Sequence, residues 1–179
     1  MIETSRLVLS RPAAGDADEV FRRYAGDSDV TRYLNWPRHR SAGDTRAFLN
    51  WSDGEWERWP AGPFLIRSRG TGQLLGGTGL SFHTFQEAMT GYVLAKDAWG
   101  QGYATEALAA MVDLAWQLDV DWLFALCHPD HGASIRVLEK CGFDRDPGGT
   151  RPVEFPNLEP GKLIDALCFA RSRPDRKEA

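Results

Sequence analysis

One stretch, Gly91 to Leu108, constrains the fold most, because it predicts a strand, a turn and a helix in a single run. The segment 91–95 is short, apolar and aromatic, which is typical of a half-buried strand. From Tyr103 onward, apolar residues recur at helical spacing as far as Leu118. We therefore expect a helix of about four turns that begins near Gly102.

The turn between strand and helix contains Gly100 and Gly102. Glycine allows positive φ and leaves no Cβ atom to keep a ligand off the backbone amides, while a helix start adds unpaired N–H groups and the positive end of the dipole. The turn is therefore a candidate phosphate site, although the same pattern also occurs as a plain connection. The dinucleotide fingerprint would need glycine at Thr105, and the P-loop Gly-Lys-Ser/Thr is absent.

A second block, from Cys127 to Phe143, adds a family resemblance. Together the two blocks resemble the GNAT superfamily of acetyl-coenzyme A-dependent N-acetyltransferases. The pyrophosphate loop of that family reads Gln/Arg-x-x-Gly-x-Gly/Ala; Gly102 and Ala104 match it, and Trp99 stands where Gln or Arg is usual.

The second block follows the family pattern Asn-x-x-Ser…Leu-Glu-Lys-x-Gly-Phe, with His131 in place of the Asn. The matching residues are Ser134, Leu138, Glu139, Lys140, Gly142 and Phe143. The N-terminal segment 3–12, together with 29–34, resembles the branch that contains the ribosomal-protein-alanine N-acetyltransferases. The resemblance runs from about residue 3 to residue 170.

Periodicity and turn residues predict an α/β (α+β) fold with one domain over residues 1–170 and a charged, disordered tail over 171–179. Strands are expected near 6–11, 63–67, 74–82, 89–95, 121–128, 151–155 and 163–170, and helices near 16–25, 42–58, 102–118 and 132–141. The resemblance implies a mixed, mostly antiparallel sheet of six or seven strands, flanked by about four helices, whose central strands splay apart to admit the cofactor.

Composition excludes several classes of protein. A net charge of −4 and a pI near 5.6 argue against a nucleic-acid-binding surface. No segment is apolar enough to span a bilayer, so we expect no membrane partner and a cytoplasmic location. Cys127, Cys141 and Cys168 lack paired spacing, which predicts neither disulfides nor a metal site; Cys127 is interpreted as a small buried side chain.

The resemblance implies a binding mode for acetyl-coenzyme A. Its pyrophosphate would rest on the amides of the loop formed by Trp99, Gly100, Gln101, Gly102, Tyr103, Ala104 and Thr105. Its pantetheine arm would pair along Val93 and Leu94 like an added strand, with an amide near Leu94 free to bind the thioester oxygen. His131 would fill the role of the Asn, hydrogen-bonding the pantetheine.

The general acid and the general base of the acetyl transfer each have a candidate residue and an alternative. Leu138 stands where many relatives carry a tyrosine acid, so Ser134 is the candidate that protonates the leaving thiol; its alternative role is to cap the helix or contact pantetheine. Glu87 would share a strand face with Met89, where relatives often place the base, and is the first candidate base; a solvated turn carboxylate is the alternative.

Three histidines are further candidates for proton transfer, namely His83 in the same turn and His128 and His131 near the cofactor. Glu106, in the first turn of the central helix, is interpreted as structural because a carboxylate there meets the helix dipole favourably.

The predicted activity is transfer of an acetyl group to a primary amine, on a small molecule or a protein N-terminus, by direct attack in a ternary complex. A non-catalytic acyl-coenzyme A-binding module that keeps the loop is the alternative. Trp51, Trp56 and Trp59 form either a satellite core or an aromatic wall of the acceptor pocket. The protein is expected to be a monomer or a homodimer.

Overall fold

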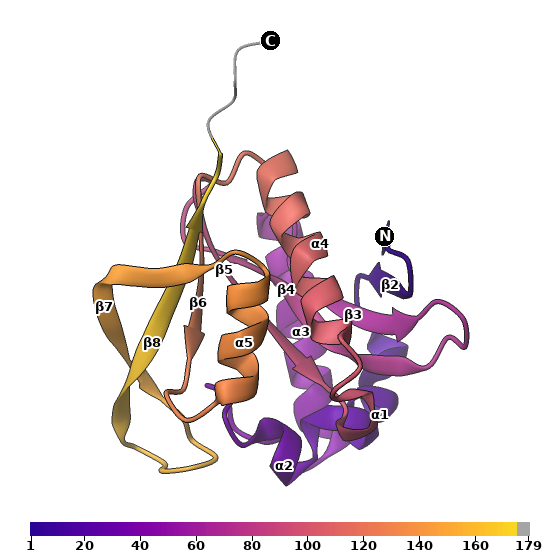
Figure 1. Ribbon diagram of the computed structural model, residues 1–179. Coiled ribbons are helices and arrows are strands. Elements are labelled where there is room, and N and C mark those ends of the chain that lie inside the picture. The colour runs from indigo at the N-terminus through magenta and orange to yellow at the C-terminus, as the bar shows by residue number, and fades with distance from the viewer. Residues whose placement is uncertain (175–179) are drawn as a thin grey trace.

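The computed structural model describes residues 1–174, without the side chain of residue 147, and shows a single twisted sheet with helices on both faces (Figure 1). The strands are β1 (Ile2–Glu3), β2 (Leu7–Ser10), β3 (Pro63–Ser68), β4 (Leu74–Phe82), β5 (Glu87–Leu94), β6 (Trp122–Cys127), β7 (Asp144–Glu154) and β8 (Leu163–Ser172). The α-helices are α1 (Ala17–Val20), α2 (Ser28–Thr31), α3 (Ala42–Arg58), α4 (Tyr103–Gln117) and α5 (Gly132–Lys140). The short helical turns η1 (Ala14–Asp16), η2 (Phe21–Ala25) and η3 (Lys96–Ala98) complete the set.

The strand order is β1-β2-β3-β4-β5-β6-β8-β7, and every pair is antiparallel except β5 with β6. That parallel pair joins only Glu87–Met89 to Trp122–Phe124. Beyond it, β5 continues to Leu94 and β6 to Cys127 without pairing to each other. The predicted splaying of the central strands is therefore confirmed.

Alternating side chains of β3 divide the core between the two faces of the sheet. Phe64 and Ile66 join the large cluster that also contains side chains of α4, whereas Leu65 joins Val20 and Tyr24 in a second cluster. This is the alternation expected of a strand covered on both faces. Figure 1 accordingly shows α4 and α5 on the near side of the sheet and α3 behind it.

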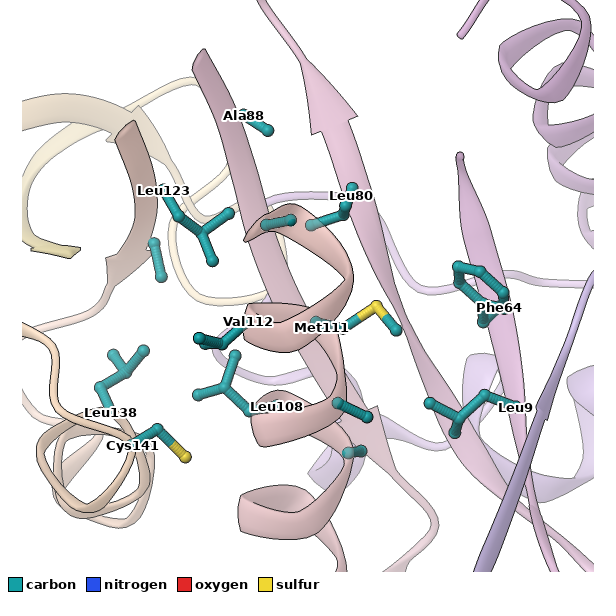
Figure 2. Close-up of a cluster of buried hydrophobic side chains, with 14 of the residues drawn as sticks. Leu9, Phe64, Leu80, Ala88, Leu108, Met111, Val112, Leu123, Leu138 and Cys141 are labelled. Carbon is teal, nitrogen blue, oxygen red and sulfur yellow. The ribbon is translucent and has the colours of Figure 1, made fainter. Parts of the chain in front are cut away.

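Helix α4 supplies the centre of the larger cluster. Leu108, Met111 and Val112 are 0–3% exposed and point towards strand side chains that include Leu80 and Leu123 (Figure 2). At about 1.5–3 kcal/mol for each fully buried large apolar side chain, this stripe fixes the helix firmly on the sheet. The N-terminal end of α4 is thereby held at the end of β5.

The fold class is confirmed, with differences in strand number and length. The described part has eight strands instead of six or seven, because the short β1 pairs with β2 and was not expected. The strand expected near 151–155 is the end of β7, whose bulge between Arg145 and Thr150 accommodates the glycines and the proline that suggested a loop.

Part of the expected tail is also ordered structure. Arg171 and Ser172 extend β8 by pairing with Leu123 and Trp122, so the prediction of disorder was wrong at these two residues. Residues 175–179 lie outside the described residues. The single domain over 1–170 stays a prediction.

Candidate active site

The loop before α4 has the conformation that its glycines predict. Gly100 and Gly102 have φ of 73° and 80°, in the left-handed region that favours glycine. The Glu106 amide donates to the Gly102 carbonyl oxygen at 3.1 Å, which is the first bond of the helix. The amides before it have no acceptor within the helix, so they are available to an anion.

The N-terminal segment braces this loop through Glu106. Its Oε1 accepts hydrogen bonds from Thr4 Oγ1 (2.6 Å), Ser5 Oγ (2.9 Å) and the Arg6 amide (2.8 Å). Arg6 Nε donates to Oε2 at 2.6 Å, and its Nη1 donates to the Gln101 carbonyl oxygen at 2.9 Å. Partial burial would raise the pKa of Glu106, but these hydrogen bonds outweigh it and lower the pKa to about 2. The geometry supports the structural interpretation of Glu106.

Trp99 connects the loop to the preceding strand. Its Nε1 donates to the Leu94 carbonyl oxygen at 2.8 Å, while the ring remains 46% exposed. The indole therefore occupies one backbone acceptor at the end of β5 and fixes the loop against the strand. This tie explains how tryptophan can stand where the family pattern has Gln or Arg.

A cavity of about 930 Å³ opens where β5 and β6 part. Its strand wall contains Met89 to Val93 from β5 and Ala125 to Cys127 from β6. Ser134 and Leu138 of α5, with His128 and His131 before that helix, line the adjoining wall. The cavity then continues towards residues 33–40 and α3. Of the predicted cofactor residues, Val93, His131 and Ser134 thus face one continuous space.

Ser134 is hydrogen-bonded to a residue that the sequence did not single out. Tyr92 Oη lies 2.8 Å from Ser134 Oγ and 3.2 Å from the Ser134 carbonyl oxygen. Burial raises the pKa of Tyr92, although the bond to Ser134 acts the other way, so its phenol stays protonated at neutral pH. Burial also raises the pKa of the Cys127 thiol. Two hydrogen-bonded hydroxyls, one from β5 and one from α5, therefore line the cavity.

The two histidines of the second block sit in a stack of rings. The Tyr33 ring lies 4.7 Å from that of His131 and 5.0 Å from that of His128, centroid to centroid. Burial, and then the neighbouring His128, lower the pKa of His131, so its imidazole is neutral and can accept a proton. Tyr33 could not be found from spacing, because it comes from a distant segment.

Glu87 and His83 lie elsewhere. Glu87 begins β5 opposite Trp122, at the closed end of the gap, and its carbonyl oxygen accepts from the His83 amide at 2.9 Å. The His83 ring packs edge-on against Phe124, with centroids 5.3 Å apart. Neither residue lines the cavity, whose one carboxylate in the described part of the chain is Asp44. The structure therefore does not bring these two candidates together with Ser134.

Comparison with known proteins decides the family. Residues 6–144 match the family described as Acetyltransferase (GNAT) domain. The chain belongs to this family. Membership makes it an acetyltransferase that takes its acetyl group from acetyl-coenzyme A, as the sequence predicted.

Individual relatives agree with this assignment. The chain is 28% identical over 170 residues to an uncharacterised N-acetyltransferase p20 of Bacillus licheniformis, covering 93% of each chain. A GNAT-family acetyltransferase structure from Bacillus anthracis has a TM-score of 0.80 at 25% identity, covering 96% of this chain and 97% of the other. The RimL ribosomal L7/L12 alpha-N-protein acetyltransferase in complex with coenzyme A has a TM-score of 0.81 at 21% identity, covering 94% and 95%.

Among residues 1–174, no helix is both long and apolar enough to cross a bilayer. Across the same residues, no three His, Cys, Asp or Glu side chains gather as metal ligands would.

Proposed function

We propose that this acetyltransferase transfers the acetyl group of acetyl-coenzyme A directly to a primary amine within a ternary complex. The observation that carries the proposal is the cavity at the open end of the β5–β6 gap, which contains Ser134 and His131 and adjoins the strand leading into the glycine loop. One end can receive an extended thioester and the other an amine.

The two halves of the cofactor would be held by backbone groups. The pyrophosphate would meet the free amides of residues 100–105 at the positive end of α4. Pantetheine would pair with the edge of β5 beyond Met89, which has no strand partner on the β6 side. Because these are main-chain contacts, they tolerate Trp99 and His131 at positions where the family pattern has other residues.

Chemistry then requires two proton transfers. The amine nitrogen bonds to the thioester carbon, the C–S bond breaks, and the leaving thiolate takes a proton from the Ser134 hydroxyl. Tyr92 orients that hydroxyl and passes it a replacement proton, which Tyr92 in turn recovers from water. The attacking amine loses its proton to neutral His131 or to water; Glu87 and His83 could act only through water from outside the cavity. Correct placement of the reactants alone can supply about 7–11 kcal/mol, so modest acid and base groups suffice.

The structural neighbours are named for different classes of amine. One structural neighbour is named for a ribosomal protein and another, from Vibrio cholerae, is a spermidine N-acetyltransferase in complex with coenzyme A and spermine. Both protein N-termini and small amines therefore remain candidates. The cytoplasmic location and the monomeric or dimeric state stay predictions.

Thiol release from acetyl-coenzyme A, measured with a panel of amines, tests the proposal. We expect amine-dependent turnover, and Ser134→Ala should lower kcat about 100-fold with little change in coenzyme A affinity, the contribution of a general acid. Ser172→Ala, at the end of β8, is the matched control. Tight binding of coenzyme A without turnover on any amine would favour the non-catalytic module.

A further inference from the structure

Beyond the splayed strands the cavity extends into what we call the acceptor arm, the space between residues 33–40 and the α3 side chains Asp44, Ala47, Phe48 and Trp51. None of the loop residues 99–105 lines this cavity, and we assign the acceptor arm to the amine.

A continuous run of rings forms one wall of the acceptor arm. Ring centroids are 5.2 Å apart from Trp36 to His39, 6.2 Å from His39 to Phe48 and 5.7 Å from Phe48 to Trp51. Burial lowers the pKa of His39, although Asp44 acts the other way, so this ring is neutral at pH 7. The planes of neighbouring rings are inclined by 33–49°, so the wall is a stepped apolar surface of ring faces and edges. The Trp51 side chain at its end remains 51% exposed.

The charged groups of the acceptor arm are Arg38, Arg40 and Asp44. The Asp44 carboxylate is already engaged, because its Oδ2 accepts from the amides of Arg40 (2.7 Å) and Ser41 (3.1 Å) at the start of α3. In the described part of the chain, no ion pair involves the guanidinium group of Arg38 or that of Arg40. Arg38 and Arg40 are both exposed, and with Asp44 they give the arm a formal charge of one positive unit in a protein whose overall charge is −4.

The charge of the acceptor arm distinguishes two kinds of acceptor, a polyamine and an amine that also carries one negative charge. Aromatic walls attract cations, but a polyamine would bring several positive charges next to two arginines and find one carboxylate, already occupied by amides. A monoanion would balance the excess charge, and a guanidinium matches the planar carboxylate well. A phosphate is less suited, because Ser41 and Asp44 already cap the N-terminus of α3.

We infer that the acceptor carries its amine on a flat apolar group together with one carboxylate, held by the ring wall and by Arg38 and Arg40, and that polyamines are excluded. The inference rests on the proposed function and narrows it to amino-acid-like or peptide-like aromatic acceptors. A nearby positive charge also disfavours the ammonium form of the bound amine. This helps to produce the neutral nucleophile, since Asp44 is already held by backbone amides.

Product binding tests the inference separately from turnover. The probes are N-acetylphenylalanine and N-acetylphenylethylamine, which share the ring and the amide and differ by the carboxylate. With coenzyme A bound, we expect the anionic probe to bind about tenfold more tightly, equivalent to about 1.4 kcal/mol. The double variant Arg38→Gln/Arg40→Gln should abolish this preference, whereas Arg32→Gln, on the same segment but outside the cavity lining, should retain it.

Competition with spermidine tests whether polyamines are excluded from the acceptor arm. We expect spermidine to displace neither probe from the wild-type protein and to serve as a poorer acceptor than phenylalanine by at least about tenfold, or about 1.4 kcal/mol. Equal binding of the two probes, binding of neither, or a preference that survives the double arginine variant would overturn the inference. Failure of the proposed function itself would show differently, as probe binding without acetylation of any amine.

Discussion

Replacing Glu106 with Gln tests whether the N-terminal segment braces the glycine loop through a partly buried charge. The pKa of this carboxyl falls from 4.5 to about 2, and its side chain is only 15% exposed. One pKa unit is worth 1.36 kcal/mol, so the charge stabilises the folded state by about 3 kcal/mol. Gln keeps one acceptor oxygen, and we therefore expect Glu106→Gln to lose about 2–3 kcal/mol at pH 7.

The pH dependence gives this prediction its sign. A depressed carboxyl pKa contributes stability that is fully present above pH 4.5 and is lost as the pH falls towards 2. The difference in the free energy of unfolding between wild type and Glu106→Gln should therefore be constant from pH 7 to pH 5 and decrease below pH 4.5.

Urea unfolding measures this difference in the free energy of unfolding. The transition is followed by the fluorescence of the seven tryptophans and by circular dichroism. Asp53→Asn is the control, because Asp53 pairs with Arg11 where both side chains are nearly half exposed; we expect it to lose less than about 1 kcal/mol. The reasoning would be refuted if Glu106→Gln lowered the free energy of unfolding by less than about 1 kcal/mol at pH 7. It would also be refuted if the difference between variant and wild type did not decrease at pH 3.

Three other substitutions probe the site and the sheet. Gly102→Asp should weaken coenzyme A binding at least about 100-fold by calorimetry, because it strains a left-handed position and puts negative charge where phosphate is expected; unchanged affinity would make the loop a plain connection. Gly76→Ala should cost about 1–3 kcal/mol in urea unfolding, since its Cβ would lie 2.0 Å from the Val93 carbonyl oxygen, whereas Gly91→Ala meets nothing within 4 Å and should cost far less. Tyr92→Phe should lower kcat about tenfold at an unchanged KM for acetyl-coenzyme A, because Ser134 loses its partner; an unchanged kcat would remove Tyr92 from the mechanism.

Several features of the site were predictable because they are local in the chain. The positive φ of Gly100 and Gly102 follows from the residue type, and the start of α4 follows from the apolar stripe after Tyr103. The left-handed Gly142 after α5 is of the same kind. Each depends on residues within one or two turns, so the sequence carries the information directly.

Other features depend on where distant segments meet. Glu87 has the alternation expected for the face of Met89, yet it lies at the closed end of the gap, because pairing with β6 ends at Met89. The hydrogen bond from Tyr92 to Ser134 joins residues 42 positions apart, and the ring of Tyr33 stacks on that of His131 from a distant segment after α2. No spacing rule predicts such contacts.

The sequence by itself determined the backbone conformation of the glycine loop and the class of fold, because glycine conformation and apolar periodicity act over short range. Only the tertiary structure decided which side chains share the cavity and what charge the acceptor arm carries. The physical reason is that the cavity is lined by segments far apart in the chain, namely residues 33–40, α3, β5, β6 and α5, which meet only through the packing of the whole fold.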